Sequence, residues 1–306
     1  MLLASINSSL LVTILAGAVA GGTSILYAGL GETISERAGV INVGTEGTML
    51  IGALAAFAAA VESGSPWVGV VAGAAAGAAL ALVHAIVVVY RKASQLATGL
   101  VVLFLALGVT SLYGTSYVSS DINGFTTWNV PLLARIPALG PILFQHDPLV
   151  YLSYLAVPLV SLLLFRTRWG LLIRTAGERP EALLAYGVSP TLVRTVAVVL
   201  GGALSGIGGA QLSTALALSW SEGMTAGRGF IAVALVIFAA WKPVRILAGA
   251  WLFGAAITLG SVLQVRGVSV NQFILDALPY VLTLVVLVIL LRRGRQFAPE
   301  ALGQTV

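Results

Sequence analysis

The sequence predicts an all-α protein that forms a polytopic membrane bundle of about nine helices, within a range of eight to ten. Hydrophobic residues make up 58% of its 306 residues and the mean hydropathy is +1.02, which is typical of membrane proteins. Four stretches also lack Asp, Glu, Lys and Arg entirely, and each reaches the roughly 20 apolar residues that cross a bilayer. These stretches are 63–90, 93–120, 195–221 and 246–265.

Apolar runs place the individual spans along the chain. The runs lie at 9–30, 44–61, 67–90, 94–118, 149–165, 192–218, 229–241, 246–264 and 277–291. As a helix, the run at 229–241 reaches only about 20 Å, less than the ~30 Å hydrocarbon core. We therefore expect a broken or re-entrant helix there, which requires surrounding protein or a cavity. No Lys or Arg precedes Arg37, so we expect the first span to be retained rather than cleaved as a signal peptide.

The basic residues predict the orientation of these spans. With the C-terminus in the cytoplasm, 13 of the 16 Lys and Arg residues lie inside, and only Arg135, Arg228 and Arg266 lie outside. This positive-inside bias predicts that 166–194 and the C-terminus are cytoplasmic and that 119–148, a loop with at most a short helix, is external. It also accounts for the net charge of +5 without a nucleic-acid partner.

Two spans carry small residues at intervals of four. Such spacing lets helix backbones approach closely, and packing of this kind holds membrane helices together. We therefore expect both spans to make tight helix–helix contacts. The residues are Gly69, Gly73 and Gly77 in one span, and Gly202, Ser205, Gly206 and Gly209 in the other.

Three of the chain's eleven acidic residues fall in the run 31–52, GETISERAGVINVGTEGTMLIG, beside a span. They are Glu32, Glu36 and Glu46, and Asn42 lies between them. One interpretation is an ordinary cytoplasmic loop with solvated charges. The other is a buried polar cluster, which is costly unless its members are paired or hydrogen-bonded.

The longest cytoplasmic loop, 166–194, contains a predicted short helix at 178–186. Acidic residues and a proline suit its first turn, and Gly187 suits a left-handed stop. Ser189 can then cap the next helix. Residue spacing alone leaves open whether this helix lies on its own protein or binds a partner. Its predicted apolar face comprises Ala182, Leu183 and Tyr186.

Both runs resemble a known family. The order of residues in 31–52 resembles the signature of ABC importer permeases of the branched-chain amino acid, simple sugar and nucleoside family, in the nucleoside or simple sugar branch. The run AGERPEALLAYGVSP resembles the coupling segment of these permeases, where a short helix docks on the ATPase subunit. The resemblance continues through 200–210, 227–232 and 278–283, and it covers roughly residues 28–290.

The resemblance implies a single transmembrane domain, 1–306, with a vitamin B12-importer-like (type II) architecture. Its implied partners are a second related permease in a heterodimer, a double-cassette ATPase that binds the ATP, and an external substrate-binding lipoprotein. Arg179 and Glu181 depart from the family pattern, which has Asn and often a basic residue there. The coupling residues that match are Glu178, Pro180, Ala182, Ala185, Gly187 and Val188.

The sequence contains no GxxxxGK[ST] phosphate loop and no triad or metal-ligand spacing, so we expect neither enzyme activity nor a cofactor in this chain. A secondary transporter, the alternative class, usually places ionisable groups at mid-membrane. Only Glu46 and Asp276 come close, and His84 is expected to be a packed histidine.

The polar residues in the spans are mostly neutral, which suits an uncharged solute. We therefore expect an inner-membrane permease, with its C-terminus in the cytoplasm, that imports a neutral nucleoside or simple sugar. The alternatives are a sugar-specific ABC permease and an ion-gradient-driven secondary transporter. A structural anchor for helix ends is the competing role for Glu46. The candidates for the translocation path are Asn42, Glu46, Gln211 and Ser213.

Overall fold

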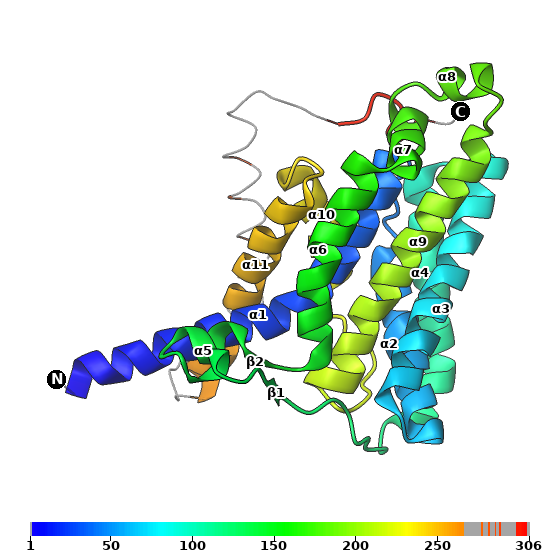
Figure 1. Cartoon of the computed structure of the whole chain (residues 1–306). Coiled ribbons are helices and arrows are strands. Elements are labelled where there is room, and N and C mark those ends of the chain that lie inside the picture. The colour runs from blue at the N-terminus through cyan, green and yellow to red at the C-terminus, as the bar shows by residue number, and fades with distance from the viewer. Residues whose placement is uncertain are drawn as a thin grey trace.

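The computed structural model describes residues 2–265 and 298–304, and the isolated positions 277, 281, 285 and 288 (Figure 1). Most of these residues are helical, and the described strands have only two residues each, which confirms the all-α prediction. Short π-helical turns, η1 (Ile86–Tyr90) and η4 (Leu212–Leu216), extend α3 and α9. The α-helices are α1 (Leu2–Arg37), α2 (Thr45–Ser63), α3 (Pro66–Ala85), α4 (Gln95–Gly114), α5 (Leu139–Leu143), α6 (Pro148–Arg166), α7 (Arg168–Glu178), α8 (Pro180–Ala185), α9 (Pro190–Gln211), α10 (Arg228–Phe238) and α11 (Pro243–Val265).

Seven of the described helices are long and apolar enough to cross a membrane: α1, α2, α3, α4, α6, α9 and α11. The span expected at 229–241 corresponds to α10, which has only 11 residues and is too short to cross on its own. This agrees with the broken helix predicted at 229–241. The expected ninth span at 277–291, together with Asp276, lies outside the residues that the structure describes, apart from four isolated positions.

Helix α9 packs against α1, α2 and α3 through glycines. A Cβ on Gly52 of α2 would lie 2.5 Å from the Cα of Gly206, and a Cβ on Gly77 of α3 would lie 2.8 Å from it. A Cβ on Gly206 itself would collide with the carbonyl oxygen of Gly73. Backbones this close leave no room for a side chain, so the predicted small-residue contacts are confirmed.

Helix α1 continues to Arg37, beyond the predicted end of the first span at residue 30. Glu32 and Glu36 therefore lie on its last turns, where they are 2% and 1% exposed. The interpretation as a loop with solvated charges is wrong for these residues. Neighbouring helices cover this end of α1, so the burial of Glu32 and Glu36 depends on tertiary contacts that the local sequence does not show.

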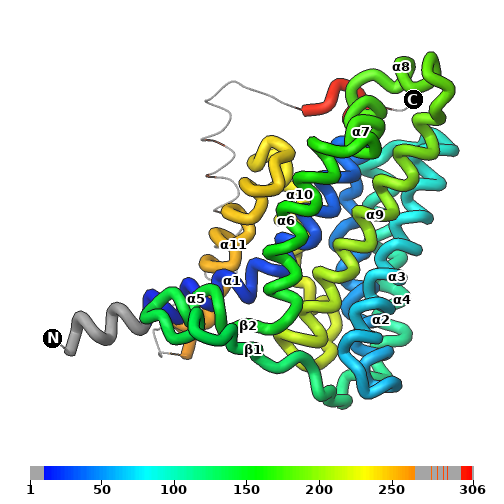
Figure 2. Tube along the Cα trace, viewed as in Figure 1, coloured from blue at the N-terminus to red at the C-terminus, as the bar shows by residue number. Residues whose placement is uncertain are grey.

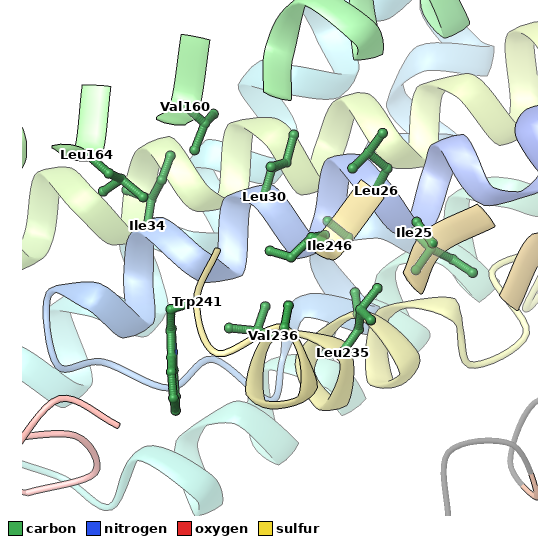
Figure 3. Close-up of a cluster of buried hydrophobic side chains, with 14 of the residues drawn as sticks. Ile25, Leu26, Leu30, Ile34, Val160, Leu164, Leu235, Val236, Trp241 and Ile246 are labelled. Atoms are coloured by element: carbon green, nitrogen blue, oxygen red, sulfur yellow. The ribbon is translucent and has the colours of Figure 1, made fainter. Parts of the chain in front are cut away.

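A hydrophobic cluster surrounds α1 and joins it to α6, α10 and α11. Figure 3 shows side chains of α1 meeting those of α6 on one side and those of α10 and α11 on the other. This core fixes the helices that carry the polar residues described below. Its labelled members are Ile25, Leu26, Leu30, Ile34, Val160, Leu164, Leu235, Val236, Trp241 and Ile246.

The two ends of the bundle differ in structure (Figure 2). One end carries α7, α8 and the segment 298–304. The other carries α5 and a small antiparallel pair of strands, β1 (Trp128–Asn129) and β2 (Gln145–His146). The segment predicted to be an external loop therefore contains a compact module as well as the expected short helix. The 3₁₀ turns η2 (Thr115–Tyr117) and η3 (Leu133–Arg135) also lie in the connection from α4 to α6.

Asp147 joins this module to the first turn of α6. Its Oδ1 accepts hydrogen bonds from the backbone N–H groups of Leu149, at 2.9 Å, and Val150, at 3.2 Å. Pro148 occupies the first helical position, where no N–H is needed. Burial raises the pKa of the Asp147 carboxyl above its usual value, and these two hydrogen bonds partly offset that rise.

Candidate functional site

The polar run 31–52 begins with a contact between Glu32 and the start of α2. One carboxylate oxygen of Glu32 accepts a hydrogen bond from the backbone N–H of Asn42 at 2.7 Å, and the other accepts one from the hydroxyl of Thr45 at 3.0 Å. These bonds satisfy donors at the N-terminal end of α2, where a negative charge is also favoured by the helix dipole. Glu32 therefore ties the last turns of α1 to α2.

Glu46 connects α2 to α10. Its Oε1 accepts hydrogen bonds from the Thr225 hydroxyl at 2.6 Å and the Gly227 N–H at 2.8 Å, and its Oε2 accepts one from the Gly229 N–H at 2.6 Å. A Cβ on Gly229 would lie 2.5 Å from the Cα of Glu46, so glycine is needed for this approach. Glu46 thus supplies the negative charge at the N-terminus of the short helix.

The other path candidates are also buried within the single chain. Ser213 donates to the carbonyl of Ala53 at 2.8 Å, and Gln211 donates through Nε2 to the carbonyl of Ala20 at 3.3 Å. Asn42 Oδ1 and Gln211 Oε1 are buried and accept no hydrogen bond from the residues that the structure describes. Asn42 and Gln211 therefore keep an unused acceptor, whereas both carboxylate oxygens of Glu46 are engaged.

Two further buried polar side chains organise the end that carries α7. Arg194 donates to the carbonyls of Ala38, at 3.1 Å, and Ala176, at 2.9 Å. Gln95 accepts a hydrogen bond from the Ile41 N–H at 2.7 Å. Sequence reasoning treated Arg194 only as an orientation signal and passed over Gln95. Both residues lie near the start of a span, where a polar side chain can reach the carbonyls of neighbouring segments. This position in the sequence could have identified them.

His84 on α3 contacts Ile41, the same residue that donates to Gln95. It is fully buried, and its Nε2 is 3.3 Å from the carbonyl oxygen of Ile41. This is the packed position that was expected for it. The contact adds α3 to the helices that hold the turn between α1 and α2.

The predicted coupling segment forms two helices rather than one. Glu178 ends α7, and α8 begins at Pro180, so the predicted helix start at residue 178 was two residues early. Gly187 has a φ of +71°, as predicted for a left-handed stop. The Ser189 hydroxyl accepts a hydrogen bond from the Leu192 N–H at 3.4 Å, so Ser189 caps α9 as predicted.

The outward face of α8 differs from the predicted apolar face. Leu183 is buried in the core, and Ala182 is half-buried. Leu184 is 63% exposed and Tyr186 86% exposed, and Ala185 lies exposed between them. Residue spacing left open whether the predicted face lies on this chain or binds a partner. The structure shows Leu183 packed on its own chain, because a six-residue helix is oriented by the elements it packs on.

The segment 298–304 packs beside α7. The Ala301 N–H donates to the Gly177 carbonyl at 2.8 Å, and the Glu300 N–H donates to the Glu178 carboxylate at 3.3 Å. Gln95 Nε2 also lies 3.4 Å from the Gln304 carbonyl. The segment near the C-terminus and the coupling segment therefore lie at the same end of the bundle, as expected (Figure 1).

Residues 13–291 match the family described as branched-chain amino acid transport system, permease component. The chain belongs to this permease family. Its members are components of ABC importers, and seven membrane-length apolar helices agree with a multi-pass membrane subunit. No solved structure matches the chain.

Three similar proteins carry transport names. A protein of Haloferax volcanii, TsgC13, provisionally named as a glucose ABC transporter permease, is 43% identical over 83% of this chain and 77% of its own. The nucleoside ABC transporter permease NupC of Lactococcus lactis is 35% identical over 92% of both chains. The guanosine ABC transporter permease NupQ of Bacillus subtilis is 34% identical over 91% of both.

Proposed function

We propose that this chain is the permease subunit of an ATP-driven importer for a neutral nucleoside. The similarity to NupC and NupQ carries the proposal, because it extends over more than 90% of each chain. The expected partners are a second related permease, a double-cassette ATPase and an external binding lipoprotein.

In this proposal α8 receives the motion of the ATPase. Its exposed residues, Leu184, Ala185 and Tyr186, form a compact apolar surface at the end that carries α7 and 298–304. The flanking turn at Gly187 and the cap at Ser189 connect this surface directly to α9. A displacement of α8 is therefore passed to the helix that packs against α1, α2 and α3.

The path through the subunit is proposed to use Asn42 and Gln211. In the described structure both keep a buried acceptor without a hydrogen bond, and nucleoside hydroxyl and amino groups are donors. Gln211 also lies where α9 passes into the π-helical turn η4, and such turns are frequent at functional sites. Glu46 and Ser213 are proposed to hold helices on either side of the path. Gln211→Ala should raise the substrate concentration for half-maximal uptake more than Ser213→Ala.

A second candidate substrate is a simple sugar. The 43% identity to TsgC13 favours it, although that match covers less of each chain. The two substrates share hydroxyl-rich, uncharged chemistry, so the same neutral polar residues would serve either.

Uptake by the complete complex in proteoliposomes tests the proposal. We expect nucleoside uptake that needs ATP on the ATPase side and the external binding protein, and that survives an ionophore. Transport by this chain alone under an imposed ion gradient would favour a secondary transporter. Uptake of pentoses or hexoses without nucleosides would leave the ABC mechanism intact and replace the substrate.

A further inference from the structure

The short helix α10 is held at both ends by carboxylates from the same run, 31–52. At its N-terminus, Glu46 binds the backbone N–H groups of Gly227 and Gly229. After its C-terminus, the indole N–H of Trp241 donates to Oε2 of Glu36 at 2.6 Å. Both carboxylates are buried, at 6% and 1% exposed, so each bond forms in a low-dielectric environment.

The carboxylates at the two ends of α10 differ in the number of hydrogen bonds that they accept. Both oxygens of Glu46 accept hydrogen bonds, whereas Oε1 of Glu36 is buried and accepts none within the described part of the chain. Among the described residues, three hydrogen bonds to Glu46 hold the N-terminal end of α10, whereas a single bond to Glu36 holds the turn after its C-terminus. The N-terminus of α10 is therefore the fixed end and its C-terminal turn the end that can rearrange.

The turn after α10 is also strained. The backbone N–H of Trp241 donates a hydrogen bond to the carbonyl of Val236 at 3.1 Å, and this bond ends the helix in a Schellman-like turn. Ala240 and Trp241 both have positive φ, at 51° and 55°, where glycine is usual. The conformation persists because the Trp241 ring is buried in the hydrophobic cluster, at the same end of it as Ile34 and Leu164 in Figure 3.

A line of ring contacts runs from this turn to the coupling segment. The Arg37 guanidinium lies 5.8 Å from the Trp241 ring centre and 5.9 Å from that of Phe165. Arg174 of α7 lies 5.6 Å from the Phe165 ring centre. These cation–π contacts are individually weak. They can therefore be exchanged during a transport cycle without unfolding the bundle.

We propose that Trp241 is the positioning residue through which movement of α7 and α8 shifts α10, with Glu36 holding its indole in the state described here. This rests on the proposed function, since it assumes an ATPase that acts on the coupling segment. Helix α10 then pivots at Glu46 and opens or closes the path from its C-terminal end. Trp241 touches no solute in this scheme and acts through α10.

Trp241→Phe is the decisive variant, because it keeps a ring for Arg37 and the core but removes the N–H donor to Glu36. In the reconstituted complex we expect ATP hydrolysis and subunit assembly to persist while solute taken up per ATP falls about tenfold, the loss of one charge-assisted hydrogen bond. Glu36→Gln keeps an acceptor and should retain more coupling. Trp251→Phe on α11 is the matched control, since the Trp251 N–H has no hydrogen-bond partner in the described structure.

Hydrogen exchange of the permease alone gives a second measurement that needs neither partner nor solute. Trp241→Phe should speed amide exchange across 228–242, and Trp251→Phe should leave that segment unchanged. Unchanged exchange together with a normal uptake-to-hydrolysis ratio would overturn the proposal. So would a parallel loss of assembly, hydrolysis and uptake, which marks a merely structural residue. If the wild-type complex moves no solute with ATP, the proposed function fails, and the exchange measurement still decides the role of Trp241.

Discussion

At the scale of single residues, the placement of α10 depends on Glu46. Its carboxylate meets one hydroxyl and two backbone N–H groups that would otherwise be buried without partners. Sequence reasoning gave Glu46 two roles, a path residue or an anchor. Its three hydrogen bonds support the anchor. The donors lie about 180 residues away in the chain, so spacing alone could not identify them.

Glu46→Ala should lower the thermal stability of the purified permease. Removing the carboxylate leaves three donors unsatisfied in the core, at a cost on the order of 3 kcal/mol. Glu62→Ala is the matched control, because Glu62 lies exposed near the other end of α2 and accepts a hydrogen bond from the Tyr117 hydroxyl. The measurement is thermal unfolding in detergent. Equal unfolding temperatures for the two variants would contradict the anchoring role.

At the scale of elements, the glycine contacts and the coupling segment show what sequence can and cannot predict. Intervals of four between small residues predicted that α3 and α9 each make close helix contacts, because close backbone approach requires small residues. That the two helices pack against each other is shown by the structure and was not predicted. The orientation of α8 was only partly predicted. Leu183 and Tyr186 fit one helical face by spacing, yet they point to opposite environments, because the short helix is oriented by its contacts with α7 and α9.

Gly206→Ala should separate α9 from α3. The added methyl group would meet the Gly73 carbonyl and lie 3.2 Å from the Gly77 Cα, and overpacking of this kind costs about 1–3 kcal/mol. Gly108→Ala on α4 is the control, since nothing lies within 4 Å of a Cβ there. Its better helix propensity should stabilise α4 by up to about 1 kcal/mol. Thermal unfolding of the two variants should therefore shift in opposite directions.

Ala185→Asp should weaken binding of the ATPase without unfolding the permease. Ala185 is exposed on α8, so the new carboxylate stays solvated until docking would bury it, at a cost of a few kcal/mol. Ser119→Asp, exposed near the other end of the bundle, serves as the control. Co-purification with the ATPase measures the effect. Undiminished co-purification of the Ala185 variant would exclude α8 as the docking element.

At the scale of the whole molecule, one central helix organises the bundle. Helix α9 packs on α1, α2 and α3 and leads back through Ser189 to α8. Helix α4 lies at the outside, with Leu100, Val101 and Phe104 exposed, as suits a surface facing lipid or a second permease. Hydropathy predicted the spans well because bilayer thickness sets their length. It could not predict the extension of α1 to Arg37, since burial by neighbouring helices keeps those polar turns helical.

The orientation of the bundle can be tested directly, because the chain contains no cysteine. The 13-to-3 distribution of basic residues predicts that α8 faces the cytoplasm and residue 119 faces outward. Single cysteines at Ser119 and Ala185, both exposed, should react differently with a membrane-impermeant thiol reagent on intact cells. We expect labelling at residue 119 only, and labelling at both after the cells are permeabilised. Labelling at residue 185 alone on intact cells would invert the topology, and would also place the proposed ATPase surface on the wrong side of the membrane.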